Sequence, residues 1–468
     1  MNNNHILYIS IMMLLCFSAV GQPNSTGVKD EDVLMIKKIH TEVLLRGQVY
    51  PWLTELCLKH GGRIAGSSQY LSAANYTKNV LASLDGVKSY HQACEANYWK
   101  RGDLEEVYMV NASGDLLPLK ALSLGNSVAT PTGGILAEVV EVKSLDEVDK
   151  LGVEGVSGKI IFYNRPMDPS QIRTFSAYGG AVDQRVYGAS KAAEYGAAAA
   201  LVRSMTTSLD DFAHTGVTNY RDSTKRVPGI AISTNDAERL SKAIKSGTVN
   251  VFINTNCENM GVRSAPTVVA EIKGSKYPDE IILVGGHLDS WDVGQGAHDD
   301  GAGCVQSMEV LRTLIAINYK PNRTIRCVLF SNEENGLAGG RTYAKVSGER
   351  GEFHLAAIES DAGGFSPKGF SFEADTAVFK QYYRNVSQWL PLLESYGLQF
   401  ETGGSGADIG PLKYQKGLLV GLRPDSQRYF DFHHTADDRI ENVNKRELEL
   451  GAAAMTSLVF LIDKYGIK

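Results

Sequence analysis

The sequence predicts an α/β fold, in which a mostly parallel, mixed β-sheet carries helices on both faces and a second, β-rich domain is inserted into the chain. From residue 266 onward, short apolar segments alternate with stretches of helical periodicity, which is typical of such a sheet. Between about residues 118 and 255 the pattern changes to closely spaced short strands. A length of 468 residues suits two or three domains.

The chain is expected to begin with a cleaved export signal over residues 1–21. Residues 6–20 form an apolar run, shorter than the roughly 20 residues that a membrane span needs, and Ala19-Val20-Gly21 offers the small residues of a cleavage site. A buried N-terminal helix is the alternative. Residues 22–45 are interpreted as a leader or a propeptide. No later stretch is long and uncharged enough to span a bilayer, so we expect a secreted, periplasmic or lumenal protein.

Three helices are expected next, and the larger domain begins where the first of them ends. Apolar residues recur at helical spacing over residues 31–46, and similar spacing predicts helices over residues 50–60 and 68–84. We assign residues 46–117 to the larger domain, which resumes at residue 256.

The inserted domain is placed at residues 118–255. Apolar and β-branched runs predict its strands over residues 135–142, 159–163, 197–202, 227–233 and 249–253. Helices are expected at residues 187–195 and 236–245. Because this block contains no cluster of histidines and carboxylates, the chemistry is expected in the larger domain.

The remainder of the larger domain, residues 256–468, alternates strands and helices. Strands are predicted over residues 267–272, 281–284, 326–330, 355–358 and 418–421. The run at residues 281–284 is wholly apolar, which is typical of a strand buried on both faces. A helix is expected over residues 305–317. Another, over residues 445–464, begins after Asn444 with Glu447 three positions on, as in a capping box.

Composition excludes some classes of function. Lys and Arg number 47 against 53 Asp and Glu, and the net charge of −6 includes no basic block, so a nucleic-acid partner is not expected. Five cysteines remain after signal cleavage, which allows at most two internal disulfides and one free thiol. No CxxC motif occurs, so a cysteine-based metal site has no support.

Acidic residues and histidines follow the predicted buried strands at several separate places. They are found at residues 287–289, 298–300, 333–334, 359–361 and 433–434. Since ligands bind at the carboxyl ends of strands in an open α/β sheet, these segments are expected to converge. Imidazole and carboxylate together suit Zn²⁺ better than Ca²⁺ or Mg²⁺, so the sequence predicts a hydrolytic zinc site.

The adjacent acids Glu333 and Glu334 suit two different tasks. Neighbouring side chains diverge, so one carboxylate can bind a metal while the other accepts a proton from the attacking water. A solvated surface acid is the alternative for Glu333.

These motifs resemble those of the M28 peptidases. The segments concerned are Gly-Gly-His-Leu-Asp-Ser, His-Asp-Asp-Gly-Ala-Gly, Ser-Asn-Glu-Glu-Asn-Gly, Glu-Ser-Asp-Ala-Gly-Gly and His-His-Thr-Ala-Asp-Asp. The resemblance extends over almost the whole mature chain and includes residues 60–67. It implies a zinc-exopeptidase fold of the phosphorylase/hydrolase type, two Zn²⁺ per chain and a homodimer. The inserted block resembles a protease-associated (PA) domain, most clearly at residues 227–233.

The resemblance also implies individual roles. It places His287 and Asp361 on one zinc, Glu334 and His434 on the other, and Asp299 between the two. Glu333 matches the general base. Asp289 matches the acid that orients a ligand histidine, and Asp300 matches the residue that a cis peptide joins to the bridging Asp. His298 and His433 are left unassigned.

The expected function is therefore zinc-dependent hydrolysis of dipeptides or short peptides by an exopeptidase. A catalytically inactive binding protein of the same family is one alternative, and a single-zinc acyltransferase of the glutaminyl-cyclase kind is another. The sequence leaves open which end of the peptide is recognised. The Gly-rich segment at residues 402–409 and Arg423 are candidates for holding a terminal charge, against ordinary surface roles.

Overall fold

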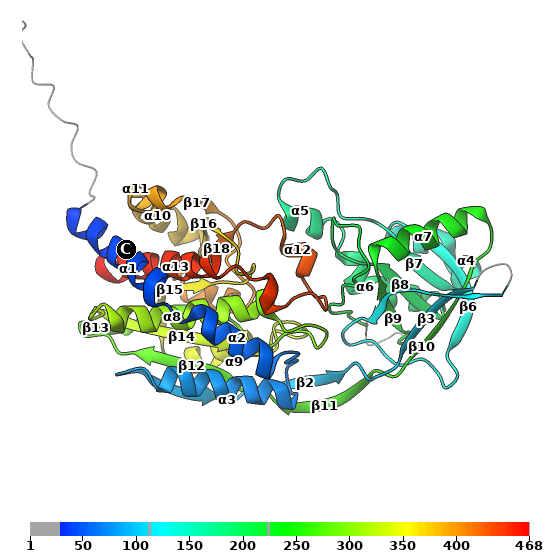
Figure 1. Cartoon of the computed structure of the whole chain (residues 1–468), viewed down its shortest axis with the longest axis horizontal. Helices are drawn as coiled ribbons and strands as arrows, with labels where there is room; N and C mark the ends of the chain where they lie inside the picture. The colour runs from blue at the N-terminus through cyan, green and yellow to red at the C-terminus, as the bar shows by residue number, and fades with distance from the viewer. Residues whose placement is uncertain (1–28, 111–113, 222–224, 468) are drawn as a thin grey trace, which may run out of the picture.

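The computed structural model describes residues 29–110, 114–221 and 225–467. The predicted signal peptide at residues 1–21 lies outside this part of the chain. Two eight-stranded sheets dominate the architecture and lie one after the other along the long axis of the molecule (Figure 1). In the described residues, no helix has the length and apolar character that crossing a membrane requires.

The first sheet is mixed, with a parallel centre. Its spatial order is β1 (Lys88–Gln92), β12 (Thr267–Ile272), β14 (Arg323–Phe330), β13 (Tyr277–His287), β15 (Phe353–Glu359), β18 (Leu418–Pro424), β16 (Pro367–Glu373) and β17 (Gln399–Thr402). The four strands from β14 to β18 run parallel, and β12 and β16 flank them in the antiparallel direction. Strands β12, β13, β14, β15 and β18 contain the five predicted for this domain.

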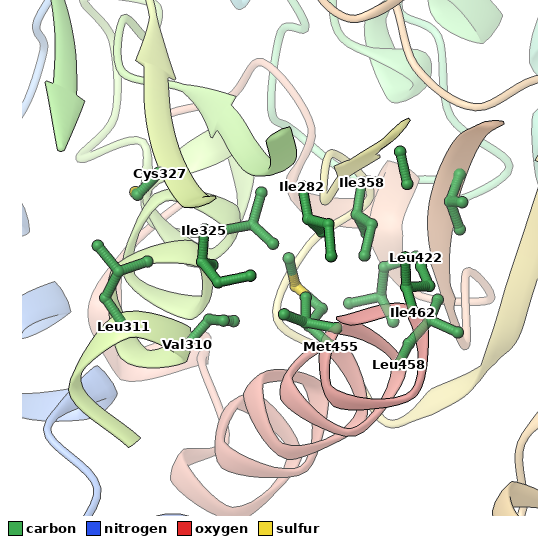
Figure 2. Close-up of a cluster of buried hydrophobic side chains, with 14 of the residues drawn as sticks. Ile282, Val310, Leu311, Ile325, Cys327, Ile358, Leu422, Met455, Leu458 and Ile462 are labelled. Atoms are coloured by element: carbon green, nitrogen blue, oxygen red, sulfur yellow. The ribbon is translucent and has the colours of Figure 1, made fainter. Parts of the chain in front are cut away.

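Helices cover both faces of this sheet. One face packs against α1 (Asp30–Arg46), α2 (Val49–His60), α3 (Ser68–Ala82), α8 (Ala302–Ala316), α10 (Thr376–Ser387) and α13 (Lys445–Tyr465). The other packs against α9 (Ala338–Glu349) and the short helix η3 (Gly410–Gln415). Figure 2 shows Ile282, Ile358 and Leu422 of the sheet against Met455 and Leu458 of α13. The predicted α/β class is confirmed.

The helix α1, which overlaps the segment predicted as a leader or a propeptide (residues 22–45), packs on this layer. Ile36, Ile39 and Val43 are fully buried, and the helix packs on α13 and α8. The Lys464 ammonium also lies 2.6 Å from the carboxylate of buried Asp32. Removing residues 30–46 would expose this apolar surface to water.

The second sheet has the order β4 (Leu116–Pro118), β3 (Glu105–Val110), β10 (Asn250–Thr255), β6 (Ile135–Val142), β7 (Ile160–Tyr163), β8 (Ala199–Arg203), β9 (Gly229–Ile232) and β5 (Ala121–Ser123). Helices α4 (Leu145–Val156) and α6 (Asp183–Glu194) pack on one face, and α7 (Thr234–Ser246) packs on the other. The predicted β-rich block is therefore a second α/β layer.

The first strand of the second sheet lies earlier than the change of pattern near residue 118 suggested. Strand β3 pairs with β10 and with β4, so the sheet begins at Glu105. The strand is short, and its main partner β10 lies far along the sequence, so local pattern did not assign it. We call residues 105–255 the second unit and the rest of the described chain the first unit.

An antiparallel pair of strands links the two units. β2 (Glu95–Lys100) pairs with β11 (Glu258–Ser264) beside the junction (Figure 1). Helix α5 (Thr174–Gly179) of the second unit meets α12 (Tyr429–Phe432) of the first, where the rings of Phe175 and Tyr429 stack with centroids 5.2 Å apart. The five described cysteines are buried, unpaired thiols.

Candidate metal centre

The predicted ligands meet at the carboxyl ends of the parallel strands of the first sheet. His287 is the last residue of β13, Glu334 follows β14, and Asp361 follows β15. Asp299 lies in the short segment η1 (Ala297–Gly301) that precedes α8, and His434 follows α12. All five are brought together from distant parts of the sequence, as expected for an open α/β sheet.

Asp299 occupies the middle of this cluster. One carboxylate oxygen, Oδ1, lies 3.1 Å from His287 Nε2, and the other, Oδ2, lies 3.2 Å from His434 Nε2. His287 Nε2 is also 3.5 Å from Asp361 Oδ1, and His434 Nε2 is 3.0 Å from Glu334 Oε2. Each oxygen of Asp299 therefore faces a different histidine with its own acidic partner.

The donor set fits divalent cations. Donor atoms of His287, Asp299 and Asp361 lie within 4.8 Å of one another, and those of Asp299, His433 and His434 form a second such group. Glu334 Oε1 is buried without a hydrogen-bond partner. A buried, unpaired carboxylate oxygen is costly unless a cation satisfies it. Nitrogen and oxygen donors in this combination suit Zn²⁺.

Asp289 positions the Glu pair through its carboxylate. Its Oδ1 accepts the backbone N–H of Glu333 at 3.1 Å, and its Oδ2 accepts that of Glu334 at 3.2 Å. His287 Nδ1 instead lies 3.0 Å from the backbone carbonyl of Asp289 and 3.9 Å from its carboxylate. The side chain thus orients the neighbouring acids, while the main chain holds the histidine.

Two further acids hold the segment around Asp299. The peptide between Asp299 and Asp300 is cis, as the family resemblance implied. The Asp300 carboxylate accepts the N–H of His287 at 3.0 Å. Asp438, which our sequence analysis missed although it ends the His-His-Thr-Ala-Asp-Asp segment, accepts the N–H groups of His298 and Asp299 at 2.7 and 3.2 Å. The position of Asp438 at the end of this motif was the feature of the sequence from which its role could have been predicted.

The two unassigned histidines differ in role. His298 Nδ1 accepts the N–H of Gly364 at 3.1 Å and its Nε2 lies 3.2 Å from the carbonyl of Asn442, so both nitrogens are occupied away from the cluster. Burial lowers the pKa of His298 to about 4. His433 instead stacks on His434 and places Nε2 3.8 Å from Asp299 Oδ2, at the edge of the cluster.

The second unit also reaches the cluster, which sequence reasoning did not anticipate. Thr215 lies in the loop between β8 and β9, donates its N–H to the carbonyl of His434 at 3.0 Å, and places its own carbonyl 3.3 Å from His434 Nδ1. Thr215 is neither a histidine nor an acid and belongs to no recognised motif, so the sequence did not indicate this contact.

A cleft of about 530 Å³ opens over the cluster between the two units. Asp299, Glu333, Glu334, Asp361, His433 and His434 line one side, and Phe175, Tyr178, Arg185, Val217 and Asn219 of the second unit line the other. Burial, together with the nearby carboxylates Asp361 and Glu334, raises the pKa of Glu333 despite the opposing effect of His287. Such a carboxylate binds a proton more readily than an exposed one.

The candidates for holding a terminal charge are engaged within the protein. Arg423 donates from Nε to Ser371 Oγ at 2.7 Å and also bonds the carbonyl of Gly404. In the Gly-rich segment, the N–H of Ser405 is bonded to Glu373 and that of Ile409 to Glu359, each at 2.9 Å. Arg423, Ser371 and Gly404 border a separate cavity of about 790 Å³.

Comparison with known proteins identifies relatives that cover most of the chain. Residues 267–459 match peptidase family M28. Carboxypeptidase Q of Homo sapiens is 33% identical over 475 residues, which cover 98% of this chain and 95% of the relative. Carboxypeptidase Q of Mus musculus is 33% identical over 412 residues, covering 86% and 83% respectively.

Solved structures show the same architecture. A peptidase M28 precursor from Shewanella amazonensis is 30% identical and superposes with a TM-score of 0.87, covering 93% of this chain and 97% of that one. An aminopeptidase from an Aneurinibacillus strain, 19% identical with a TM-score of 0.61, shares the fold over 91% of this chain and 95% of that one.

Proposed function

The chain belongs to peptidase family M28, and from this premise we propose that it is a zinc-dependent exopeptidase that hydrolyses dipeptides or short peptides. The observation that carries the proposal is the position of Asp299, whose two carboxylate oxygens face His287 and His434 at 3.1 and 3.2 Å. A carboxylate between two such groups is what a two-metal hydrolytic site requires.

We assign the metal ligands as two sets that share Asp299. His287 and Asp361 would hold one Zn²⁺, and Glu334 and His434 would hold the other. Bound zinc would lower the pKa of water toward about 7 and polarise the scissile carbonyl. Asp289 fixes the backbone of the Glu pair, so Glu334 points to the cluster while Glu333 faces the cleft.

Glu333 is the proton acceptor in this proposal. It lines the cleft, and its burial among carboxylates favours its protonated form once a proton is available. Glu333 takes a proton from the water as the water oxygen bonds to the scissile carbonyl carbon. It then passes that proton to the amide nitrogen, so that the C–N bond breaks and the products are a carboxylic acid and an amine.

Removal of metal tests the proposal as a whole. Dialysis against a chelator should abolish dipeptide hydrolysis, and added Zn²⁺ should restore it, with two zinc ions per chain by elemental analysis. One zinc per chain would favour the acyltransferase, and none would favour the inactive binding protein. Full activity in metal-free protein would contradict the proposal.

The Glu pair offers a sharper test. Glu333→Gln keeps the side chain's shape but removes its basic oxygen, so turnover should fall about 10²–10⁴-fold while two zinc ions remain bound. Glu334→Gln should instead lose zinc, since an amide is a poorer ligand. If Glu333→Gln lost zinc while Glu334→Gln kept it, the two roles would be reversed.

The finer aspects of the prediction belong to the same proposal. We propose that the protein is exported, that the second unit is PA-like, and that two chains form a homodimer. Sedimentation at micromolar concentration should give twice the mass of one chain, and a monomer at that concentration would contradict the dimer.

A further inference from the structure

Arg185 of α6 is a buried cation without an anion. Its side chain is 4% exposed, and its Nε and Nη1 atoms have no hydrogen-bond partner. Within the described residues, no carboxylate oxygen lies within ion-pair distance of its guanidinium. A guanidinium is charged at any physiological pH, and buried charges are normally paired. The guanidinium is therefore positioned to bind an anion that the described residues do not supply.

This side chain faces the cleft above the metal centre. Arg185 lines the cleft together with Glu333, Asp299 and His434. Its Cζ lies 5.5 Å from the ring centroid of Tyr178, whose ring lies 5.4 Å from that of His433. The Tyr178 ring thus lies close both to the guanidinium and to His433 at the edge of the proposed metal centre. This placement suits an anionic group at the end of a substrate, beyond the bond that is cut.

The loop that holds His434 also holds Arg185. Gly216 follows Thr215, with φ of +130°, and a Cβ at this position would lie 2.5 Å from Cζ of Arg185. Only glycine leaves room for the guanidinium to pack on the backbone here. One short loop of the second unit therefore fixes both a proposed metal ligand and the unpaired cation relative to each other.

We propose that Arg185 binds the free carboxylate of the substrate's C-terminal residue, so that the second unit determines which end of a peptide the enzyme recognises. The inference rests on the proposed exopeptidase function. Every unmodified peptide carries one terminal carboxylate, and its amino terminus is a cation that Arg185 would repel. A guanidinium recognises a carboxylate by paired, charge-assisted hydrogen bonds. The enzyme therefore prefers substrates whose carboxyl end is free.

The experiment compares the dipeptide Ala-Leu with its C-terminal amide, using the full-length, zinc-loaded protein. The wild type should hydrolyse Ala-Leu with the higher kcat/KM. Arg185→Met should lose about 10²–10³-fold on Ala-Leu, because a buried charge partner is removed, and change less than about threefold on the amide. Arg185→Lys, which keeps the charge but not the planar fork, should fall between these two. The control Arg239→Met removes an exposed arginine of α7 and should match the wild type.

Binding measurements separate this inference from the proposed function. Calorimetry should show that leucine binds the wild type more tightly than leucinamide does, and that Arg185→Met abolishes the difference at unchanged zinc content. That result supports the proposed role of Arg185 even if neither Ala-Leu nor its amide is cleaved. Absence of cleavage would contradict only the proposed peptidase function. Equal losses on the dipeptide and the amide, or unchanged preference in Arg185→Met, would overturn the inference.

Discussion

Replacing Asp289 by Asn should weaken zinc binding although Asp289 is not a proposed ligand. The Asp289 side chain is fully buried, and its two oxygens accept the N–H groups of Glu333 and Glu334 at 3.1 and 3.2 Å. Asparagine offers one oxygen, so its amide group must face the remaining backbone donor. One charge-assisted hydrogen bond is lost, and a donor is left opposite another donor.

The expected magnitude follows from these contacts. A hydrogen bond to a charged group contributes about 1.5–3 kcal/mol, so the two glutamates lose that much restraint. Groups that orient metal ligands typically change metal affinity by about 10–100-fold, which corresponds to about 1.4–2.7 kcal/mol. We expect the dissociation constant for zinc to rise within that range in Asp289→Asn, and turnover at saturating zinc to fall because Glu333 is displaced as well.

A matched control separates the loss of orientation from a general loss of stability. Asp463 is also fully buried, and its carboxylate accepts the N–H groups of Asn322 and Arg323 at 2.9 and 2.7 Å, but at the opposite end of the first sheet's strands. Asp463→Asn should lower the free energy of unfolding and leave zinc affinity unchanged. Zinc competition against a calibrated chelator measures both variants. Wild-type zinc affinity in Asp289→Asn, or an equal fall in both variants, would refute the reasoning.

Three further predictions address the second unit, α1 and pH. Gly216→Ala should reduce kcat/KM about 10–100-fold, because the new Cβ would lie 2.5 Å from Cζ of Arg185, so that either this side chain or the loop behind His434 must move. Gly247→Ala, at φ +153° with nothing within 4 Å, should not reduce kcat/KM, and equal effects of the two substitutions would contradict this reasoning. Ile39→Ala should lower the free energy of unfolding by about 2–5 kcal/mol in urea titrations, against less than about 0.5 for Leu45→Ala at 71% exposure on the same helix. Burial lowers the pKa of His354 to about 4, so its contribution to stability is present above pH 6.5 and is lost as the pH falls from 6.5 to 4. Between pH 4 and 6.5, His354→Gln should reduce the slope of the free energy of unfolding against pH by up to about 1.4 kcal/mol per pH unit. An unchanged slope would show that His354 does not titrate on unfolding.

Local sequence pattern was sufficient to predict an element where the element's own residues indicate how it is buried or capped. The apolar run at residues 281–284 predicted a strand buried on both faces, and it lies at the centre of the first sheet within β13. Asn444 was predicted to cap the last helix, and its side chain accepts the N–H groups of Arg446 and Glu447. Both features depend on neighbours along the chain, which periodicity and capping rules describe.

Local pattern was insufficient where a residue's partner is remote. Residues 105–110 were placed in the larger domain, and strand β3 was not predicted there, because its partner β10 lies far along the chain. The helix α1 was predicted from its spacing, but nothing in its own sequence shows that α13 buries it. Such pairings are decided by long-range packing, which a window of neighbouring residues does not contain.

The sequence by itself determined the acidic and imidazole residues of the candidate metal centre, because strand ends in an α/β sheet converge and the motifs follow directly after the strands. Only the tertiary structure decided what surrounds them. It turned the Asp289 carboxylate to the backbone of the Glu pair, placed Thr215 against His434, and left Arg185 unpaired in the cleft. These contacts join residues from different elements through backbone groups and burial. Residue type and spacing indicate neither of these, so the contacts can be seen only in the folded chain.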